Sequence, residues 1–309
     1  MPSTLLMLFL LGCQAGAQPS EIARSQAPDG FWDHWGDGAA EVSGYQLTQP
    51  RYGESRSGEV VMVFVTETLT HAQRVKSDGG HRDEYTVLKL NEVRDFQTGI
   101  YDYNTMISVF VPLSGILPRG LVSRLSFSMQ EWCGHMYADL VAEHDLGSDP
   151  DTLRLTGRGY FDGESSEDRA LDAPDGGVVA EALPVLVRGL VGELLPPGTS
   201  RTVPYLPRLL DSRLLHDRLD WTTATLTRSA QPAPLTVPAG DFTAWRITVS
   251  PARGAATTWH VEQAPPHRLL GWQSETGEAA WMTGSMRTRY WQHSREGDES
   301  LRSALGLPE

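Results

Sequence analysis

The sequence is poor in cysteine and in lysine, and each shortage excludes a class of protein. Only two of its 309 residues are cysteines, Cys13 and Cys133, so a disulfide framework cannot hold the fold together. Only Lys76 and Lys89 are lysines, and 26 basic residues face 39 acidic ones, for a formal net charge of -13. Nucleic-acid binding requires a basic surface, which so acidic a chain does not supply. Because 40% of the residues are hydrophobic, we expect a soluble globular protein with an apolar core and no nucleic-acid partner.

Common catalytic motifs are also missing. No stretch matches the Walker A phosphate loop, a G-x-G-x-x-G after a strand, the H-E-x-x-H zinc motif or the G-x-S-x-G nucleophile elbow. The acidic stretches Asp145 to Asp151 and Asp162 to Asp168 lack the spacing of a calcium-binding loop. We therefore predict no metal and no cofactor, and we expect no member of the commonest nucleotide-binding or hydrolase classes.

The apolar run Leu5 to Leu11 is much shorter than a transmembrane helix and is typical of an export signal. Gly12 and Cys13 follow it directly, as in a bacterial lipobox, in which the cysteine becomes acylated. Gln14, rather than Asp, after the cysteine resembles the signal for sorting to the outer membrane. We predict a signal peptide with a lipobox over residues 1–17, lipid attachment at Cys13, and a flexible tether over residues 18–30.

A second interpretation of the same segment stays open. Ala15, Gly16 and Ala17 form an A-x-A pattern, and cleavage after it would release a periplasmic protein that begins at Gln18. Both interpretations mean export. We favour the lipoprotein, held at the outer membrane by its N-terminal lipid, because the Gly-Cys pair follows the apolar run directly.

Strand patterns dominate the rest of the chain. The stretches rich in Val, Thr, Tyr, Phe and Ile alternate apolar with polar residues, as half-buried strands do. They cover residues 58–70, 85–91, 100–113, 121–131 and 152–161, and a four-strand meander over 242–250, 257–262, 268–275 and 278–292. Helical spacing occurs only over 178–195 and 205–218. We predict a mainly β fold, a long curled antiparallel sheet or an open barrel or half-barrel, with a few short helices.

The domain boundaries follow from these patterns. We expect one β-rich domain over residues 31–295, and the sequence leaves open whether it consists of two packed halves, 31–175 and 176–295. Residues 296–309 are set apart as a C-terminal tail.

Tryptophan is the residue type that most suggests a ligand. Trp245, Trp259, Trp272 and Trp281 occur once in each strand of the predicted meander, so we expect an aromatic row across one face. Such a row either fills a core or lines a cavity. A second cluster, Phe31 to Gly38, carries Trp32 and Trp35 and an adjacent acid and base, Asp33 and His34. It either stacks on a ligand or plugs the end of the sheet, and we favour the plug because adjacent residues of an extended segment point to opposite faces.

Two further clusters could carry chemistry. Cys133 and His135 are two residues apart, which on a strand places a thiol nucleophile and its base on one face. The opposing interpretation, which we favour, is an inert cysteine. Lys89 to Asp95 alternates charges of both signs, which indicates either a buried network around a ligand headgroup or, as we favour, a salt-bridged rim of two strands.

Parts of the chain resemble known families. Residues 183–292 resemble an uncharacterised family of exported Gram-negative β-rich proteins, a domain of unknown function. The matching pieces are Leu183 to Arg188, the V-P-A-G-D-F turn at Val237 to Phe242, and Trp259 to Leu270. The first half, through Phe31 to Gly36 and Lys89 to Gly99, is similar to hypothetical exported proteins, some with a septum-formation-inhibitor label that we do not apply to this chain. The resemblance implies long curled sheets, broadly similar to the half-barrels of periplasmic lipoprotein carriers, and no known activity.

Together these observations favour an envelope lipoprotein that binds an apolar ligand, such as a lipid or an acyl chain, without catalysing a reaction, or that acts as a scaffold. The candidate binding residues are the four tryptophans of the meander with Trp32 and Trp35. The alternative is an envelope hydrolase or transferase that uses Cys133 and His135.

Overall fold

The computed structural model describes residues 27–113, 117, 120–143, 152–162 and 166–308. It is mainly β, with 55% of residues in strands and 11% in helices, and one large sheet of 16 strands that is not closed. This confirms the predicted fold class. The predicted signal, Cys13, most of the tether and the stretch Asp145 to Asp151 lie outside the described residues.

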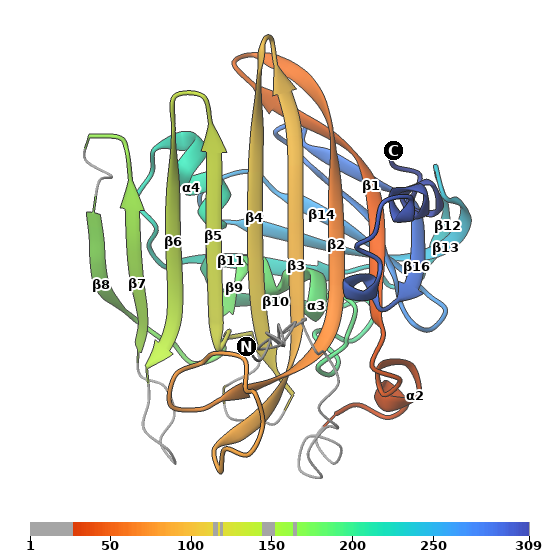
Figure 1. Ribbon diagram of the computed structural model, residues 1–309, viewed down its shortest axis with the longest axis horizontal. Helices are drawn as coiled ribbons and strands as arrows, with labels where there is room; N and C mark the ends of the chain where they lie inside the picture. Colours follow the sequence, from red (N-terminus) through yellow and green to blue (C-terminus); the bar gives the residue numbers. More distant parts are fainter. Residues whose placement is uncertain (1–26, 114–116, 118–119, 144–151, 163–165, 309) are drawn as a thin grey trace, which may run out of the picture.

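The sheet consists of two meanders joined by the first and the last strand (Figure 1). Its order is β8-β7-β6-β5-β4-β3-β2-β1-β16-β15-β14-β13-β11-β10-β9, with β12 also on β13. All pairs are antiparallel except the short β9 with β10. The strands are β1 (Ala40–Arg51), β2 (Glu54–Thr70), β3 (Glu84–Thr98), β4 (Tyr101–Pro112), β5 (Arg124–Glu131), β6 (Gly134–Glu143), β7 (Thr152–Gly159), β8 (Ser166–Asp172), β9 (Val178–Val179), β10 (Ser200–Leu206), β11 (Thr222–Arg228), β12 (Ala233–Val237), β13 (Gly240–Pro251), β14 (Thr257–Glu262), β15 (Leu269–Ser274) and β16 (Ala279–Thr288).

Pairing between β1 and β16 makes the two halves of the chain one sheet. Residues Ala40 to Thr48 pair with Thr288 to Ala279, so segments some 240 positions apart lie side by side. The predicted four-strand meander is confirmed as β13 to β16. The sequence analysis missed seven strands, β1, β6, β8, β9, β10, β11 and β12.

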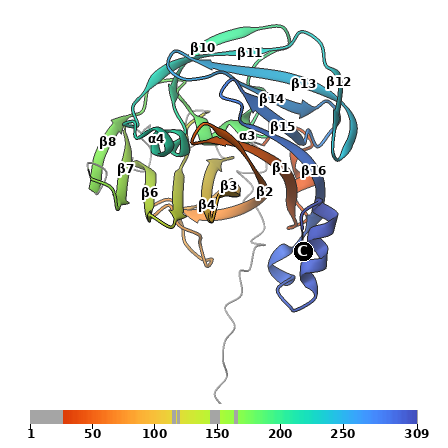
Figure 2. The same ribbon diagram turned by 90° about the horizontal axis from the view of Figure 1, so that it is seen from above.

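Alternation along the strands gives the sheet one continuous apolar face. In β4, for example, Tyr103, Ile107 and Val109 are buried on the inner side, while Asn104 and Met106 face outward. Seen from above, the sheet curves around α3 (Leu183–Leu186) and α4 (Leu209–Leu215) (Figure 2). The curl encloses one large apolar core.

A short segment of the chain fills the curl. Every residue from 178 to 188 is buried, through β9, the 3-10 helix η1 (Ala180–Ala182) and α3. The helix expected over 178–195 is therefore much shorter than its window. Pro184 lies in the first turn, where proline is tolerated, and Gly189, with φ of 71°, turns the chain soon after α3. In the second window, 205–218, only α4 is helical.

The residues set apart as a tail pack on the outer face. The 3-10 helix η3 (Asp298–Leu305) covers β1 and β16, and Leu305 and Leu307 join Val42 and Val63 in a second apolar cluster. Gly44 and Gly284 pair across the two strands directly beneath it. A Cβ on Gly44 would lie 2.4 Å from the Leu305 carbonyl oxygen, so this close approach requires glycine.

We predict that Gly44→Ala destabilises the protein by about 1–3 kcal/mol, because the added methyl group forces η3 off the sheet. Urea unfolding followed by circular dichroism measures this change. Gly157→Ala is the matched control, since its Cβ would meet its nearest neighbour at an ordinary 3.5 Å. Equal stability of the two variants would contradict the proposed packing.

Candidate functional site

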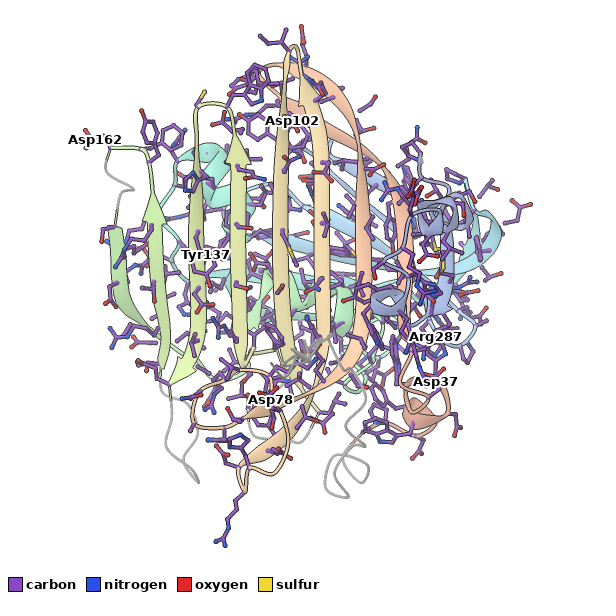
Figure 3. All side chains as sticks on the ribbon, viewed as in Figure 1. Asp37, Asp78, Asp102, Tyr137, Asp162 and Arg287 are labelled. Carbon is purple, nitrogen blue, oxygen red and sulfur yellow. The ribbon has the colours of Figure 1, made fainter. Side chains whose placement is uncertain are left out.

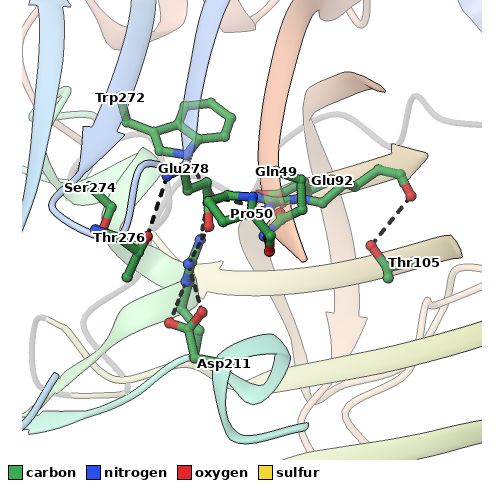
Figure 4. Close-up of polar contacts among 11 residues, drawn as sticks. Gln49, Pro50, Glu92, Thr105, Asp211, Trp272, Ser274, Thr276 and Glu278 are labelled. Carbon is green, nitrogen blue, oxygen red and sulfur yellow. Dashed lines mark hydrogen bonds and ion pairs between the residues drawn. The ribbon is translucent and has the colours of Figure 1, made fainter. Parts of the chain in front are cut away.

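A buried network of charges joins three distant parts of the chain inside the curl (Figure 4). The Glu278 carboxylate, from the turn before β16, accepts hydrogen bonds from Arg208 at 2.7 and 3.0 Å and from the Trp272 indole at 2.9 Å. Arg94 of β3 lies 3.1 Å from the same carboxylate. Arg94 also donates to Glu92 and to Gln49, and Arg208 donates to Asp211.

Every charge in this network has an opposite partner. Burial alone would raise the pKa of Glu278, but Arg208 and Arg94 hold it well below its usual range. The same contacts keep both arginines charged. Burial lowers their pKa, but the nearby carboxylates raise it by more than burial lowers it. Glu92 and Arg94 therefore belong to a buried network, not to the salt-bridged strand rim that we favoured from the sequence. A network this fully paired holds the three chain segments in fixed positions.

A second buried pair anchors the segment that fills the curl. Arg188 donates to both oxygens of Glu41 at 2.7 and 3.0 Å, and to the carbonyls of Pro266 and His267. Its guanidinium lies 4.5 Å from the centroid of the Phe64 ring. Burial would raise the pKa of Glu41, but Arg188 and His34 lower it to about 2. The pair therefore stays ionised inside the core.

Glu181 differs from the other buried carboxylates because no cation of the described residues pairs with it directly. Its side chain accepts the Leu209 backbone N–H at 2.6 Å, and burial raises its pKa to about 7. The protonated form is thus favoured in the folded state below neutral pH.

An open pocket lies where the segment after α3 meets β13 and β14. Its volume is about 210 Å³, and its apolar wall includes Val187, Leu194, Ile247 and Val261. Trp245 extends this wall. We treat this pocket, named here the Trp245 pocket, as the candidate functional site because it combines an aromatic ring, apolar walls and cationic side chains.

The polar side of the Trp245 pocket carries both signs of charge, from Arg188, Arg228 and Glu193. Arg228 lies over the Trp245 ring at 4.3 Å and donates to the exposed Glu193 and to the Leu195 carbonyl. Its Nε is buried without a hydrogen-bond partner among the described residues. Arg188 and His267 also line the pocket. Arg188 is neutralised by the buried Glu41, whereas Arg228 pairs with Glu193, whose side chain is exposed. Arg228 is therefore the cation of this lining that an anionic ligand group can reach by displacing an exposed carboxylate.

A second pocket lies on the outer face, between β16 and the C-terminal segment. Its volume is about 390 Å³, and its walls include Val42, Met286, Leu301 and Leu305. None of the tryptophans expected to bind a ligand lines it.

The four meander tryptophans do not form one row. Trp259 and Trp272 pair across β14 and β15, with ring centroids 5.5 Å apart, and both are buried in the filled core. Trp281 pairs with Gly271 and lies against His260, on the opposite face of the sheet from Trp272. The prediction of a single row is wrong for Trp281. Trp272 pairs with Ala280 of β16, and because side chains alternate along a strand, the next residue, Trp281, points to the other face.

The N-terminal aromatic cluster forms a one-turn helix, α2 (Phe31–Trp35). Phe31 and Trp35 are buried in the core, and Trp32 packs against it. His34 lies 3.4 Å from Glu41 rather than beside Asp33 as an acid-base pair. The cluster packs as a plug at the end of the sheet.

Cys133 and His135 are not on one strand face. Glu131 pairs with Gly134, so Trp132 and Cys133 form the two-residue turn between β5 and β6. Cys133 is exposed, and a hydrogen bond from its side chain to Glu131, together with that negative charge, raises the pKa of the thiol. A raised pKa reduces the thiolate fraction, which is the reactive form.

Arg228, His267 and Leu194 were missed by the sequence analysis. They come from three separate segments, which only the curl of the sheet brings to Trp245. An isolated arginine on a short strand gives no signal of a binding site by itself.

A scan against protein-family models found no match for this chain, and no curated protein matches its sequence. Within the described ranges, no three His, Cys, Asp or Glu side chains gather as a metal site. The described helices are all too short or too polar to cross a membrane.

We predict that Glu278→Gln lowers the free energy of unfolding by about 3 kcal/mol, because it leaves Arg94 and Arg208 facing each other with less compensating charge. Denaturant unfolding at pH 7 measures the change. Glu275→Gln, at an exposed position of the same turn, is the control and should be close to neutral. Similar free energies of unfolding for the two variants would contradict a stabilising role of the Glu278 ion pairs.

We predict that Glu181→Gln is more stable than the wild type at pH 8 and about equal to it at pH 4.5. Below pH 4.5 the Glu181 carboxyl is protonated in both the folded and the unfolded chain. Between pH 4.5 and about 7 only the unfolded chain loses this proton, so the stability of the wild type falls as the pH rises. The difference amounts to about 3 kcal/mol above pH 7. Unfolding in urea at the two pH values tests this, with the exposed Glu296→Gln as control. A pH-independent difference would contradict a protonated Glu181.

Proposed function

We propose that this protein is a non-enzymatic binding protein of the cell envelope and that the Trp245 pocket takes the anionic, apolar end of a small amphiphile such as an acyl carboxylate. The observation that carries the proposal is the Arg228 guanidinium lying 4.3 Å over the Trp245 ring beside apolar walls. An anionic group can replace the exposed Glu193 carboxylate at Arg228, while carbon atoms of the ligand contact Ile247 and Val261.

The size of the pocket limits the ligand. Sites for drug-sized ligands measure about 300–1,000 Å³, and the Trp245 pocket measures about 210 Å³. On the concave side of the sheet, residues 178–188 and the buried Trp259 and Trp272 occupy the core. We therefore infer a short acyl chain, or one end of a longer one, rather than an enclosed lipid.

The cellular location belongs to the same proposal. The apolar run Leu5 to Leu11 and the Gly12-Cys13 pair support an exported lipoprotein, acylated at Cys13 and held at the outer membrane of a Gram-negative cell. Cleavage before Gln18 would leave the same folded domain free in the periplasm. The proposed binding site is the same in both cases.

The surroundings of Cys133 argue against the enzymatic alternative. Cys133 lies on an exposed turn, its thiol pKa is raised, and it lines neither of the two pockets described above. A scaffold without a ligand is the function that remains if the pocket binds nothing.

We predict that octanoate binds the folded protein. Octanol, which lacks the negative charge that Arg228 binds, should bind at least tenfold more weakly. Trp245→Leu should weaken octanoate binding at least tenfold, because it removes the ring that contacts the ligand beside the cation. Isothermal titration calorimetry measures the three affinities. Trp281→Leu, on the opposite face of the sheet, should bind like the wild type.

Two outcomes would contradict the site. Loss of binding in Met286→Ala but not in Trp245→Leu would place the ligand in the outer pocket. Absence of any binding, together with no bound molecule in native mass spectra of protein purified from a Gram-negative host, would favour the scaffold.

A further inference from the structure

The most exposed large hydrophobic side chains gather at one end of the molecule. Among the described residues, five are more than half exposed, from 59% for Tyr52 to 80% for Ile100. The other three are Trp132, Tyr160 and Leu215. Monomeric proteins seldom concentrate such residues without a use for them.

The topology explains why these side chains meet. In an antiparallel meander, alternate turns lie at the same end of the sheet. The turns β1–β2, β3–β4 and β5–β6 carry Tyr52, Ile100 and Trp132, and Tyr160 follows β7 directly. Figure 3 shows Asp102 and Asp162 at this end and Asp78, in the β2–β3 turn, at the other. We call the five exposed side chains and the turns that carry them the aromatic rim.

Contacts between neighbouring turns hold the rim together. Tyr101 packs against Trp132 with ring centroids 6.3 Å apart, and the Tyr160 ring lies over Gly134. The hydroxyls of Tyr52 and Tyr103 are 2.8 Å apart. Arg51 ties this group to α4 through a 3.0 Å hydrogen bond to the Leu214 carbonyl. The rim is therefore a preformed surface rather than a set of independent loops.

In the described part of the rim, acidic and basic side chains are equal in number, although the protein is acidic. Residues 51–56, 97–104, 131–135, 158–162 and 213–218 contain five acidic and five basic side chains, while the whole chain has a formal net charge of -13. The rim thus avoids the repulsion that the rest of the surface would meet at an anionic layer. It matches a layer that carries both signs of charge.

We propose that the aromatic rim docks onto the zwitterionic headgroup layer of a lipid bilayer. Tyrosine and tryptophan prefer the membrane interface because their rings are apolar while their O–H and N–H groups stay hydrated. Ile100 and Leu215 are the two aliphatic side chains of the rim, and we assign them the apolar contacts with the lipid. The rim shares no residue with the Trp245 pocket, so the two proposals stand independently.

A protein partner fits the rim less well. A protein–protein interface has a continuous apolar centre from which charged residues are depleted. Here acidic and basic residues such as Asp102, Glu131 and Arg218 alternate with the exposed rings along the turns. This arrangement suits separate side chains that enter a headgroup layer one by one.

Cys133 provides the probe. The test uses the full chain with Cys13→Ser, which makes Cys133 its only thiol and removes any acylation. An environment-sensitive fluorophore on Cys133 should shift its emission to the blue when phosphatidylcholine vesicles are added. The same fluorophore at the opposite end, on Asp78→Cys with Cys133→Ser, should not shift.

Matched variants test the side chains themselves. In vesicle sedimentation, the double variant Ile100→Ser with Leu215→Ser should lower the partition coefficient at least tenfold, because it removes two apolar side chains from the interface. Its thermal unfolding should match the wild type, since both residues are exposed. Leu301→Ser, at an exposed leucine of η3, is the control and should not change partitioning.

Three results would overturn the proposal. One is the absence of a shift at Cys133 with unchanged partitioning of the double variant. Another is binding that appears only with anionic vesicles and disappears with salt. The third is a shift without vesicles that grows with protein concentration, which would assign the rim to a second copy of the chain.

Discussion

The carboxylate of Glu278 is the contact on which the architecture depends. It lies in the last hairpin, yet its partners Arg94 and Arg208 come from the third strand and from the loop before α4. A buried anion without its cations costs several kcal/mol, so this contact strongly favours the arrangement in which the three segments meet. Pairing of β1 with β16 then continues the sheet between the two halves, and the Arg188–Glu41 pair secures the segment that fills it.

This filling determines where the protein can bind anything. A curled sheet of 16 strands suggests a large cavity, but the segment 178–188 and the Trp259–Trp272 pair fill its concave side. The two proposed recognition features lie at the margins of this filled core: the Trp245 pocket at one side of the filling segment, and the aromatic rim at one end of the strands. An amphiphile taken up in the pocket and a bilayer under the rim are compatible roles, although each is tested separately.

The strand pattern could be predicted because burial on one face imposes a period of two on each strand. The meander from β13 to β16 was predicted from four such stretches and their turns. The short strands β10 to β12 were missed because they are polar, Thr-rich or interrupted by proline. For the site, Trp245 was singled out as an aromatic residue, whereas Arg228 and His267 were not, since nothing near them in sequence marks a pocket.

The sequence by itself determined the β class, the alternation of the strands, the acidic charge and the absence of a disulfide framework, because these depend on local spacing and composition. Only the tertiary structure decided which tryptophans are buried, that Glu92 and Arg94 point into the core, and that Cys133 lies on a turn. The physical reason is register: a shift of one position moves a side chain to the other face of a strand. Register across β1 and β16 depends on contacts between residues some 240 positions apart.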